Sequence, residues 1–237
     1  MEAAHHGRVV VVTGGTGALG RAVVRQFATG GAASVHVPST GDAGELQGYL
    51  GDAMTSVRMH RADLTSEQSV HAMVQAVVQE AGRIDVLANI VGGFAFAPIE
   101  DAGYAMWERM HQVNATTAFL CSRAVVPGMK ARRWGRIINM SSAAAFNRGG
   151  RGLAAYVASK ASVNALTESL AKELAAWGIT VNAVVPTVID TPANRRDDPK
   201  ADRSTWLQPE DIAGVIGFLA GDTAAVVTGS FVNLSRG

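Results

Sequence analysis

Tyr156 and Lys160 are the two side chains of this 237-residue chain whose types and spacing most directly indicate chemistry. They stand at the head of a segment in which Leu166, Leu170 and Leu174 recur at helical spacing. Residues four apart share one face of a helix, so the phenol and the ammonium point into the same space. A nearby ammonium favours the tyrosinate and brings the pKa of the phenol, ordinarily about 10, toward neutrality. The pair predicts a group that exchanges a proton with a bound molecule.

The Tyr-Lys spacing alone also fits an ordinary pair on the surface of a helix. The residues upstream favour a catalytic site instead. The run from Ile137 to Met140 predicts a buried strand, and Ser141 and Ser142 follow it directly. Ligands of α/β folds bind at the carboxyl edge of the sheet, where such strand ends lie. We expect Ser142 to hydrogen-bond a carbonyl while Tyr156 protonates the alkoxide formed by hydride transfer. Ser141 is interpreted as a strand-end hydroxyl without a chemical role.

A glycine-rich loop lies between the strand-like run Val9 to Thr13 and a helical segment that carries Val23 and Phe27. A helix N-terminus presents free N–H groups and a positive dipole end, and glycines let the backbone approach a pyrophosphate closely. The loop predicts dinucleotide binding, and a glycine-rich turn without a ligand is the alternative. The residues expected to contact the dinucleotide here are Gly14, Thr16, Gly17, Ala18, Leu19 and Gly20.

The end of the second predicted strand bears on which dinucleotide is bound. An acid usually stands about 20 residues beyond the glycines to hold the ribose hydroxyls of NAD. Here the chain reads His36 to Thr40 and has no carboxylate before Asp42. Nothing at this place repels a 2′-phosphate, and the hydroxyls of Ser39 and Thr40 can donate to one, although neither Arg nor Lys stands there. NAD and NADP both stay open, with a preference for NADP.

Short strand-like runs alternate with segments of helical periodicity along the whole chain. Buried strands joined by helices imply right-handed crossovers and a parallel sheet covered on both faces. We therefore predict an α/β fold with a doubly wound, mostly parallel seven-stranded sheet, as one domain over residues 1–237. Residues 191–208 lack clear periodicity and are predicted to form a substrate lid. The predicted strands are Val9 to Thr13, Ser34 to Val37, Ser56 to His60, Ile84 to Asn89, Gly135 to Met140, Ile179 to Val185 and Ser230 to Leu234.

Composition narrows the possible partners. Apolar residues make up 48% of the chain and charged residues 17%, which predicts a large core. A net charge of +1 does not provide the basic footprint that nucleic acid requires. No apolar run reaches membrane-spanning length, so no membrane partner is predicted and the protein is expected in the cytoplasm. No metal site is predicted either. The single cysteine, Cys121, is expected to be buried as a small apolar side chain.

In the order of these motifs, the chain resembles the short-chain dehydrogenase/reductase family over nearly its whole length. The family's glycine motif matches Thr13-Gly14 and Ala18-Leu19-Gly20, with Ala18 in place of the middle glycine. The resemblance implies a Rossmann fold that binds NAD or NADP. It further implies that Asp63 contacts adenine. The run from Asn89 to Gly92 keeps the first and last residues of the family's Asn-Asn-Ala-Gly motif, and the resemblance implies that this run lies against the cofactor.

The resemblance also assigns a catalytic tetrad of Asn114, Ser142, Tyr156 and Lys160, in which Asn114 supports a water-linked proton relay to the lysine. Thr187 stands where the family has the glycine of a Pro-Gly pair. The further cofactor contacts that the resemblance implies are Asp63, Leu64, Asn89, Val91, Gly92, Tyr156, Lys160, Pro186, Ile189 and Thr191.

Four aromatic residues are candidates for the substrate pocket by their position in the chain: Phe94, Phe96, Phe146 and Trp206. Such walls favour a substrate with an apolar portion near its carbonyl. The run Asp190 to Arg195 also resembles dihydropteridine reductases within the family, whereas Ser142 is better suited to the reduction of an ordinary ketone.

Three functional hypotheses remain. The first is an NAD(P)(H)-dependent oxidoreductase that acts on a ketone or a secondary alcohol, with Tyr156 as general acid and base. The second is a reductase of a C=N bond or a dihydropteridine-like ring, and the third is a non-catalytic dinucleotide-binding regulator. An intact set of Ser142, Tyr156 and Lys160 favours an enzyme. Family members are commonly homotetramers or homodimers that pack the long helices around Asn114 and Tyr156, so the same assembly is expected here.

Overall fold

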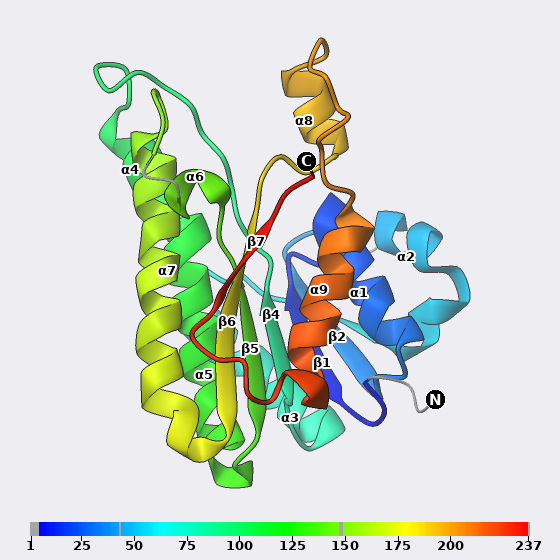
Figure 1. Ribbon diagram of the computed structural model, residues 1–237. Coiled ribbons are helices and arrows are strands. Elements are labelled where there is room, and N and C mark those ends of the chain that lie inside the picture. The colour runs from blue at the N-terminus through cyan, green and yellow to red at the C-terminus, as the bar shows by residue number, and fades with distance from the viewer. Residues whose placement is uncertain (1–4, 43, 147–148, 237) are drawn as a thin grey trace.

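The computed structural model describes residues 5–42, 44–146 and 149–236 as an α/β fold built on a seven-stranded parallel sheet (Figure 1). The strand order is β3-β2-β1-β4-β5-β6-β7, so the chain changes direction across the sheet between β1 and β4. This is a doubly wound Rossmann-like sheet, as predicted. The strands are β1 (Val9–Thr13), β2 (Ser34–Ser39), β3 (Val57–Arg61), β4 (Val86–Asn89), β5 (Gly135–Met140), β6 (Ile179–Pro186) and β7 (Phe231–Leu234).

Helices cover both faces of this sheet (Figure 1). Helices α1, α2 and α9 pack on one face, while α3, α5 and α7 pack on the other, each over its own apolar core. The helices are α1 (Ala18–Thr29), α2 (Gly44–Leu50), α3 (Glu67–Ala81), α4 (Tyr104–His111), α5 (Thr117–Arg132), α6 (Ala143–Phe146), α7 (Ala154–Leu174), α8 (Pro192–Asp197) and α9 (Pro209–Ala220). Short 3-10 turns span Gly51–Ser56, Ala175–Trp177 and Asp222–Ala224, and one π-helical turn spans Gln112–Thr116.

The local sequence explains these elements well. All five residues of β1 are buried, as a parallel strand covered on both faces requires. Helix α3 begins after Ser66, whose side chain accepts a hydrogen bond from the Ser69 amide, and it ends at Gly82 with φ 76°. Cys121 is fully buried, as predicted, and burial raises the pKa of its thiol to about 12. All seven predicted strands are confirmed, although β3, β4 and β7 begin one or two residues later than expected.

The segment predicted to be a lid contains one short helix rather than only loop. Thr191 caps α8 by accepting a hydrogen bond from the Asn194 amide, and a proline follows at the first helical position. A parallel bridge between Ile189 and Leu207 closes the base of this segment. It rises from the carboxyl edge of the sheet beside α9 (Figure 1). Within the described residues, no helix combines the length and the apolar character needed to cross a bilayer.

Candidate active site

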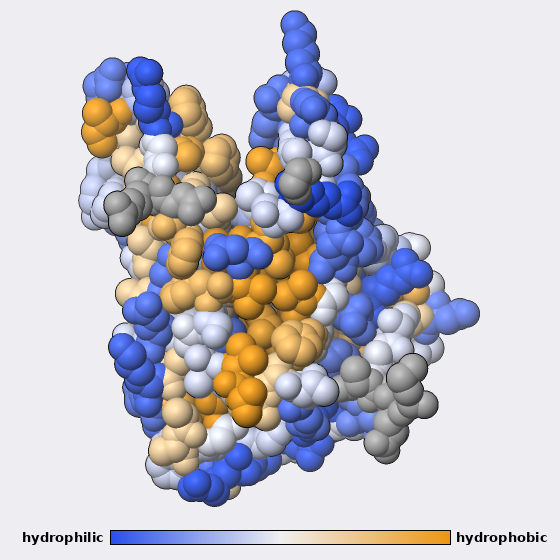
Figure 2. Space-filling view, viewed as in Figure 1, coloured by the Kyte–Doolittle hydropathy of each residue, from blue (hydrophilic) through white to orange (hydrophobic). Residues whose placement is uncertain are grey.

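The carboxyl ends of the central strands border a cavity of about 780 Å³. Figure 2 shows this end of the molecule hollowed between the side that carries α4 and α6 and the side that carries α8. The glycine-rich loop forms one wall of the cavity, and the chain after β5 together with the start of α7 forms the opposite wall. The predicted site residues that line it are Gly14, Thr16, Gly17, Leu19, Gly20, Val91, Gly92, Phe94, Ser142, Tyr156, Lys160, Pro186 and Ile189.

Tyr156 lies in the first turn of α7 and faces Ser142, to which its phenol is hydrogen-bonded. The ring of Phe94 packs edge-on against it, with centroids 5.0 Å apart. Burial raises the pKa of Tyr156, and the Ser142 hydrogen bond only partly opposes this. The expected lowering of that pKa by Lys160 is therefore not found, and loss of hydration on burial is the main effect. A protonated phenol at neutral pH is the form that donates a proton.

Lys160 lies one turn further along α7 and is buried, with 4% of its surface exposed. Its ammonium donates to the carbonyl oxygen of Met140 at 2.8 Å, at the end of β5. Within the described part of the chain no carboxylate forms an ion pair with it. Burial lowers the pKa of Lys160 to about 8, so its charge changes close to physiological pH.

Asn114 sits in the π-helical turn that joins α4 to α5, and such turns are frequent at functional sites. Its Nδ2 donates to the Gly93 carbonyl at 3.1 Å and to Ser159 Oγ at 2.9 Å, while its Oδ1 accepts from the Gly93 amide at 2.9 Å. A Cβ on Gly92 would lie 2.9 Å from Asn114 Oδ1 and 3.1 Å from Lys160 Nζ. The side chains of Asn114 and Lys160 thus both lie against Gly92, where a larger residue would not fit.

The glycines of the first loop divide into two kinds. A Cβ on Gly20 would overlap the Gly14 carbonyl oxygen, and Gly14 itself has φ +67°, so folding alone requires both. Gly17 is different, because a Cβ there would meet only the Gly14 oxygen at 3.4 Å, an ordinary contact. Gly17 caps α1 without a side-chain hydrogen bond and faces the cavity. The free helix N-terminus fits the pyrophosphate of a dinucleotide.

The other residues predicted at the cofactor lie outside the cavity lining. Asp63 follows β3, and its Oδ1 accepts hydrogen bonds from the amide and hydroxyl of Thr65, which lower the pKa of its carboxyl group. Asn89 points into the core and donates to Asn139 Oδ1 at 2.8 Å. Also outside this lining are Ala18, Ser39, Thr40, Leu64, Asn114 and Thr191.

Sequence reasoning missed one cation near Ser39. Arg61, the last residue of β3, pairs in parallel register with Ser39, the last residue of β2. Paired residues of neighbouring parallel strands direct their side chains to the same face of the sheet. The exposed Arg61 thus lies beside Ser39. Only the pairing of β2 with β3 reveals this, since the two residues are far apart in the chain.

Of the four aromatic residues predicted at the substrate, Phe94 alone lines the cavity. Phe96 is 62% exposed and lies against the backbone of Gly152. Phe146 packs against Phe231 of β7 with centroids 5.5 Å apart, and Trp206 is buried below the α8 segment. None of these three side chains lines the cavity.

Comparison with known proteins agrees with this arrangement. The family model for short chain dehydrogenases matches residues 8–202. This chain belongs to the short-chain dehydrogenase/reductase family. It is 32% identical to a 3-oxoacyl-(acyl-carrier-protein) reductase of Vibrio cholerae over 98% of this chain and 97% of the relative. It is 31% identical to a D-beta-hydroxybutyrate dehydrogenase of Rhizobium meliloti, covering 97% of this chain and 98% of the relative.

The fold is also similar to that of a putative short-chain dehydrogenase/reductase from Burkholderia xenovorans. The TM-score is 0.89 at 30% sequence identity, covering 97% of this chain and 95% of the other. Membership of the short-chain dehydrogenase/reductase family makes the protein an NAD(P)-dependent oxidoreductase. The free N-terminus of α1 at the cavity fits that cofactor.

Proposed function

We propose that the protein reduces a ketone to a secondary alcohol, or runs the reverse reaction, with Tyr156 as general acid and base. The observation that carries this proposal is that Ser142, Tyr156 and Lys160 line the same cavity as the N-terminus of α1. The nicotinamide, when bound, supplies or accepts the hydride. The raised pKa of Tyr156 keeps the phenol protonated near neutral pH, the form that donates a proton when a ketone is reduced.

Each residue has a separate task in this mechanism. The Ser142 hydroxyl donates to the substrate carbonyl and orients it toward the Tyr156 phenol. Tyr156 transfers its proton to the oxygen as negative charge develops there. Lys160, with its lowered pKa, exchanges protons at neutral pH and returns one toward Tyr156, while Asn114 holds the backbone at Gly93 beside it. The backbone amides of the residues around Gly17 would hold the pyrophosphate.

The substrate is proposed to carry an apolar portion beside its ketone. Phe94, Val188 and Ile90 line the cavity and offer apolar surface to it. Two relatives are named as a 3-oxoacyl-(acyl-carrier-protein) reductase and an acetoacetyl-CoA reductase, the second from Allochromatium vinosum at 32% identity. Their names support a ketone attached to an acyl chain as the first compounds to assay.

The test is a panel of ketones, acyl ketones and C=N compounds assayed with NADH and NADPH. Replacing Tyr156 with Phe should lower kcat by roughly 10²- to 10⁴-fold and leave cofactor binding intact. Tyr104→Phe is the matched control, since Tyr104 is an exposed tyrosine of α4. Retained activity in Tyr156→Phe would remove Tyr156 from the mechanism. Turnover of C=N compounds alone would support a dihydropteridine-like reductase, and cofactor binding without any turnover would support a regulator.

NADP is the proposed cofactor because Arg61 lies beside Ser39 at the end of β2, and a guanidinium binds a phosphate well. Arg61→Ala should raise KM for NADPH roughly tenfold and leave KM for NADH nearly unchanged. Arg58→Ala is the control, because Arg58 lies on the same strand but on the opposite face, where it bonds to Glu80. A strong preference of the wild type for NADH would refute the assignment.

A homodimer or homotetramer is proposed for the assembly. The last strand, β7, forms one edge of the sheet, and Figure 2 shows apolar surface where β7 and α9 face the viewer. Phe218 on α9 and Phe119 on the long α5 are exposed and are suited to bury against a second copy. Light scattering of the purified protein should give a mass of two or four chains, and a monomer would refute this.

A further inference from the structure

Three possible metal ligands meet between β2, β3 and the last turn of α3, away from the cavity. His36 and His60 lie on the same face of the sheet, because Pro38 pairs with His60 and His36 with Arg58. Helix α3 covers this face and brings Glu80 over the two imidazoles. One ligand atom from each of the three residues lies within 4.8 Å of the others. Sequence analysis predicted no metal site, because these residues form no local motif.

The orientation of the two imidazoles is set by hydrogen bonds. His36 Nδ1 lies 2.8 Å from His60 Nε2, and His36 Nε2 lies 2.9 Å from the hydroxyl of Ser34. When Ser34 accepts the proton of Nε2, the lone pair of Nδ1 faces His60 and Glu80. A hydrogen bond to the second ring nitrogen is how proteins orient a histidine that binds a metal.

Burial also favours the form of histidine that metals bind. It lowers the pKa of His36 to about 4 and that of His60 below its usual value. The Glu80 carboxylate acts in the opposite direction on both rings, and the positive charge of Arg58 adds to the lowering at His36. Burial thus favours neutral imidazoles, and the proton shared between the two facing ring nitrogens has to move to the far nitrogen of His60 when a metal binds.

The arginine in the cluster is compatible with a bound cation. Arg58 Nε donates to Glu80 Oε1 at 3.0 Å, and its NH1 donates to the carbonyls of Thr55 and Val57 at 2.8 and 3.1 Å. The guanidinium is thus held by backbone acceptors as well as by the carboxylate. Glu80 has a second oxygen to offer a metal while Arg58 keeps the first, as is common for carboxylate ligands. Glu80 is partly exposed, which leaves a route of entry from solvent.

We propose that His36 Nδ1, His60 Nε2 and the Glu80 carboxylate bind a divalent transition-metal ion, best matched by zinc, with water as the fourth ligand. Two imidazoles and one carboxylate are a donor set that suits zinc. The two ring nitrogens have to separate from 2.8 Å to roughly 3.3 Å to fit a tetrahedral ion. The ion would link β3, an edge strand of the sheet, to its only neighbour β2 and so stabilise that edge.

The test is calorimetric titration of the chelator-treated full-length protein with zinc chloride. We expect one equivalent to bind, a thermal midpoint that rises with zinc concentration, and slower amide exchange in residues 57–61. Cobalt chloride in place of zinc should give the intense visible absorption of a tetrahedral site. Zinc binding should be lost in His60→Ala and weakened roughly tenfold or more in Glu80→Gln. His71→Ala, which changes an exposed histidine of α3, should bind as the wild type does.

Two outcomes would overturn the proposal. The first is an absence of stoichiometric binding by the wild type, which would make the cluster a neutral histidine pair held by hydrogen bonds. The second is unchanged binding in both His60→Ala and Glu80→Gln, which would put the zinc elsewhere on the chain. Circular dichroism verifies folding of each variant. Because Glu80 is partly exposed, Glu80→Gln decides the question if His60→Ala fails to fold.

Discussion

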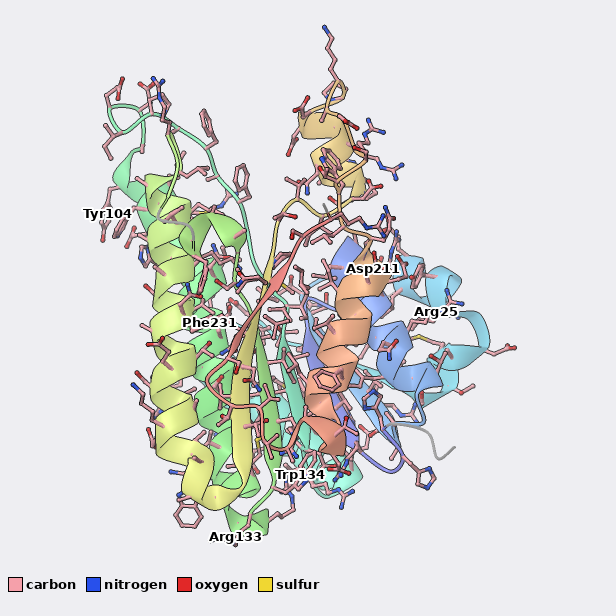
Figure 3. All side chains as sticks on the ribbon, viewed as in Figure 1. Arg25, Tyr104, Arg133, Trp134, Asp211 and Phe231 are labelled. Atoms are coloured by element: carbon pink, nitrogen blue, oxygen red, sulfur yellow. The ribbon has the colours of Figure 1, made fainter. Side chains whose placement is uncertain are left out.

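The two ends of the sheet each bury a positive charge, and they treat it in opposite ways. At the amino end, Arg136 is 3% exposed, lies 3.9 Å from Asp222 and stacks 4.3 Å from the ring centroid of Trp134. Arg8 covers the same ring at 3.8 Å and bonds to Asp222. Figure 3 shows Trp134 at the end of the molecule opposite α8. Arg136 thus faces one carboxylate, which it shares with Arg8, and one aromatic ring.

A buried carboxylate at the same amino end is also fully engaged. Asp85 precedes β4, and its Oδ2 accepts a hydrogen bond from the Val9 amide at 2.9 Å. Arg83 lies 3.0 Å away and Arg132 lies 3.9 Å away. These contacts join the starts of β1 and β4 to the helix layer. A buried charge with partners of this kind fixes the position of elements.

The carboxyl end leaves its buried charge without a counter-ion. Lys160 bonds to the Met140 carbonyl, and within the described residues no acid faces it as Asp222 faces Arg136. Its pKa falls to about 8, and that of Tyr156 rises, both chiefly through burial. A buried group with a counter-ion keeps its charge and serves structure, whereas a buried group without a counter-ion is free to change its protonation state.

The largest expected effect comes from replacing Lys160 with Met, which keeps the length of the side chain. Turnover should fall roughly 10²- to 10⁴-fold, because the proton exchange beside Tyr156 is lost. Stability at pH 7 should nevertheless rise. The lowered pKa of Lys160 corresponds to a cost of about 3 kcal/mol for the buried ammonium, and the lost hydrogen bond to Met140 offsets about 1 kcal/mol. Steady-state kinetics and urea unfolding measure the two effects.

The pH dependence of unfolding sharpens this test. Between pH 8 and about 10.5 the unfolded chain binds more protons at Lys160 than the folded protein does, so wild-type stability rises with pH there. Below pH 8 the buried ammonium exerts its full cost. The difference between Lys160→Met and wild type should therefore shrink as pH rises through this window. A variant less stable than wild type at every pH would show that the contacts of Lys160 stabilise the fold and would contradict this prediction.

The second largest effect is expected for replacement of Asp85, which should change the unfolding free energy and leave turnover unchanged. Asp85→Ala leaves the buried Val9 amide without an acceptor and should cost about 2 kcal/mol of unfolding free energy. Asp85→Asn is the control, because its side-chain oxygen can still accept from Val9. The kcat of both variants should equal that of wild type in the carbonyl assay. A large loss of kcat with an intact fold would contradict the division between the two ends.

A smaller change in unfolding free energy is expected for Arg136→Met. This substitution removes the ion pair with Asp222 but keeps a buried side chain of similar size. Asp222 is 72% exposed, so its carboxylate is hydrated once Arg136 is gone, and Met fills a similar volume. The buried Arg136 Nε, which has no hydrogen-bond partner among the described residues, is removed as well. Unfolding free energy should change by less than about 1 kcal/mol. Loss of several kcal/mol would mean that the stacking on Trp134 carries the stability of this end.

Features that are determined by residues close together in the chain could be predicted from the sequence, and features that depend on distant residues could not. Strand β1, the glycine loop and the Tyr156 to Lys160 turn are each determined within about ten residues, and the structure brings the glycine loop, Tyr156 and Lys160 to one cavity. Arg61 beside Ser39 depends instead on strand register, which hydrophobic patterning does not specify. The His36 cluster with Glu80 needs the crossing of a helix over two strands, and the sequence carries no local trace of it.

The aromatic residues fail for a related reason. Their position in the chain predicts Phe146 and Trp206 at the substrate, but Trp206 is buried and Phe146 packs one side of its ring against Phe231. Position along a loop fixes where the backbone passes and leaves the direction of the side chain to tertiary packing. The compartment and the assembly depend on partners outside the chain, so both stay predictions.

The smallest effect is expected at Thr187, where the family has glycine. Among the described residues only Arg133 is a non-glycine residue with positive φ, so the backbone at Thr187 does not require glycine. Its amide donates to the Leu234 carbonyl at 3.0 Å, and its side chain is exposed at the cavity. Thr187→Gly should therefore lower the unfolding free energy by about 0.5–1 kcal/mol, through added freedom of the unfolded chain. It should change KM for the cofactor less than about threefold. A large gain in kcat on this substitution would mean that the Thr187 side chain obstructs the cavity at the carboxyl ends of the strands.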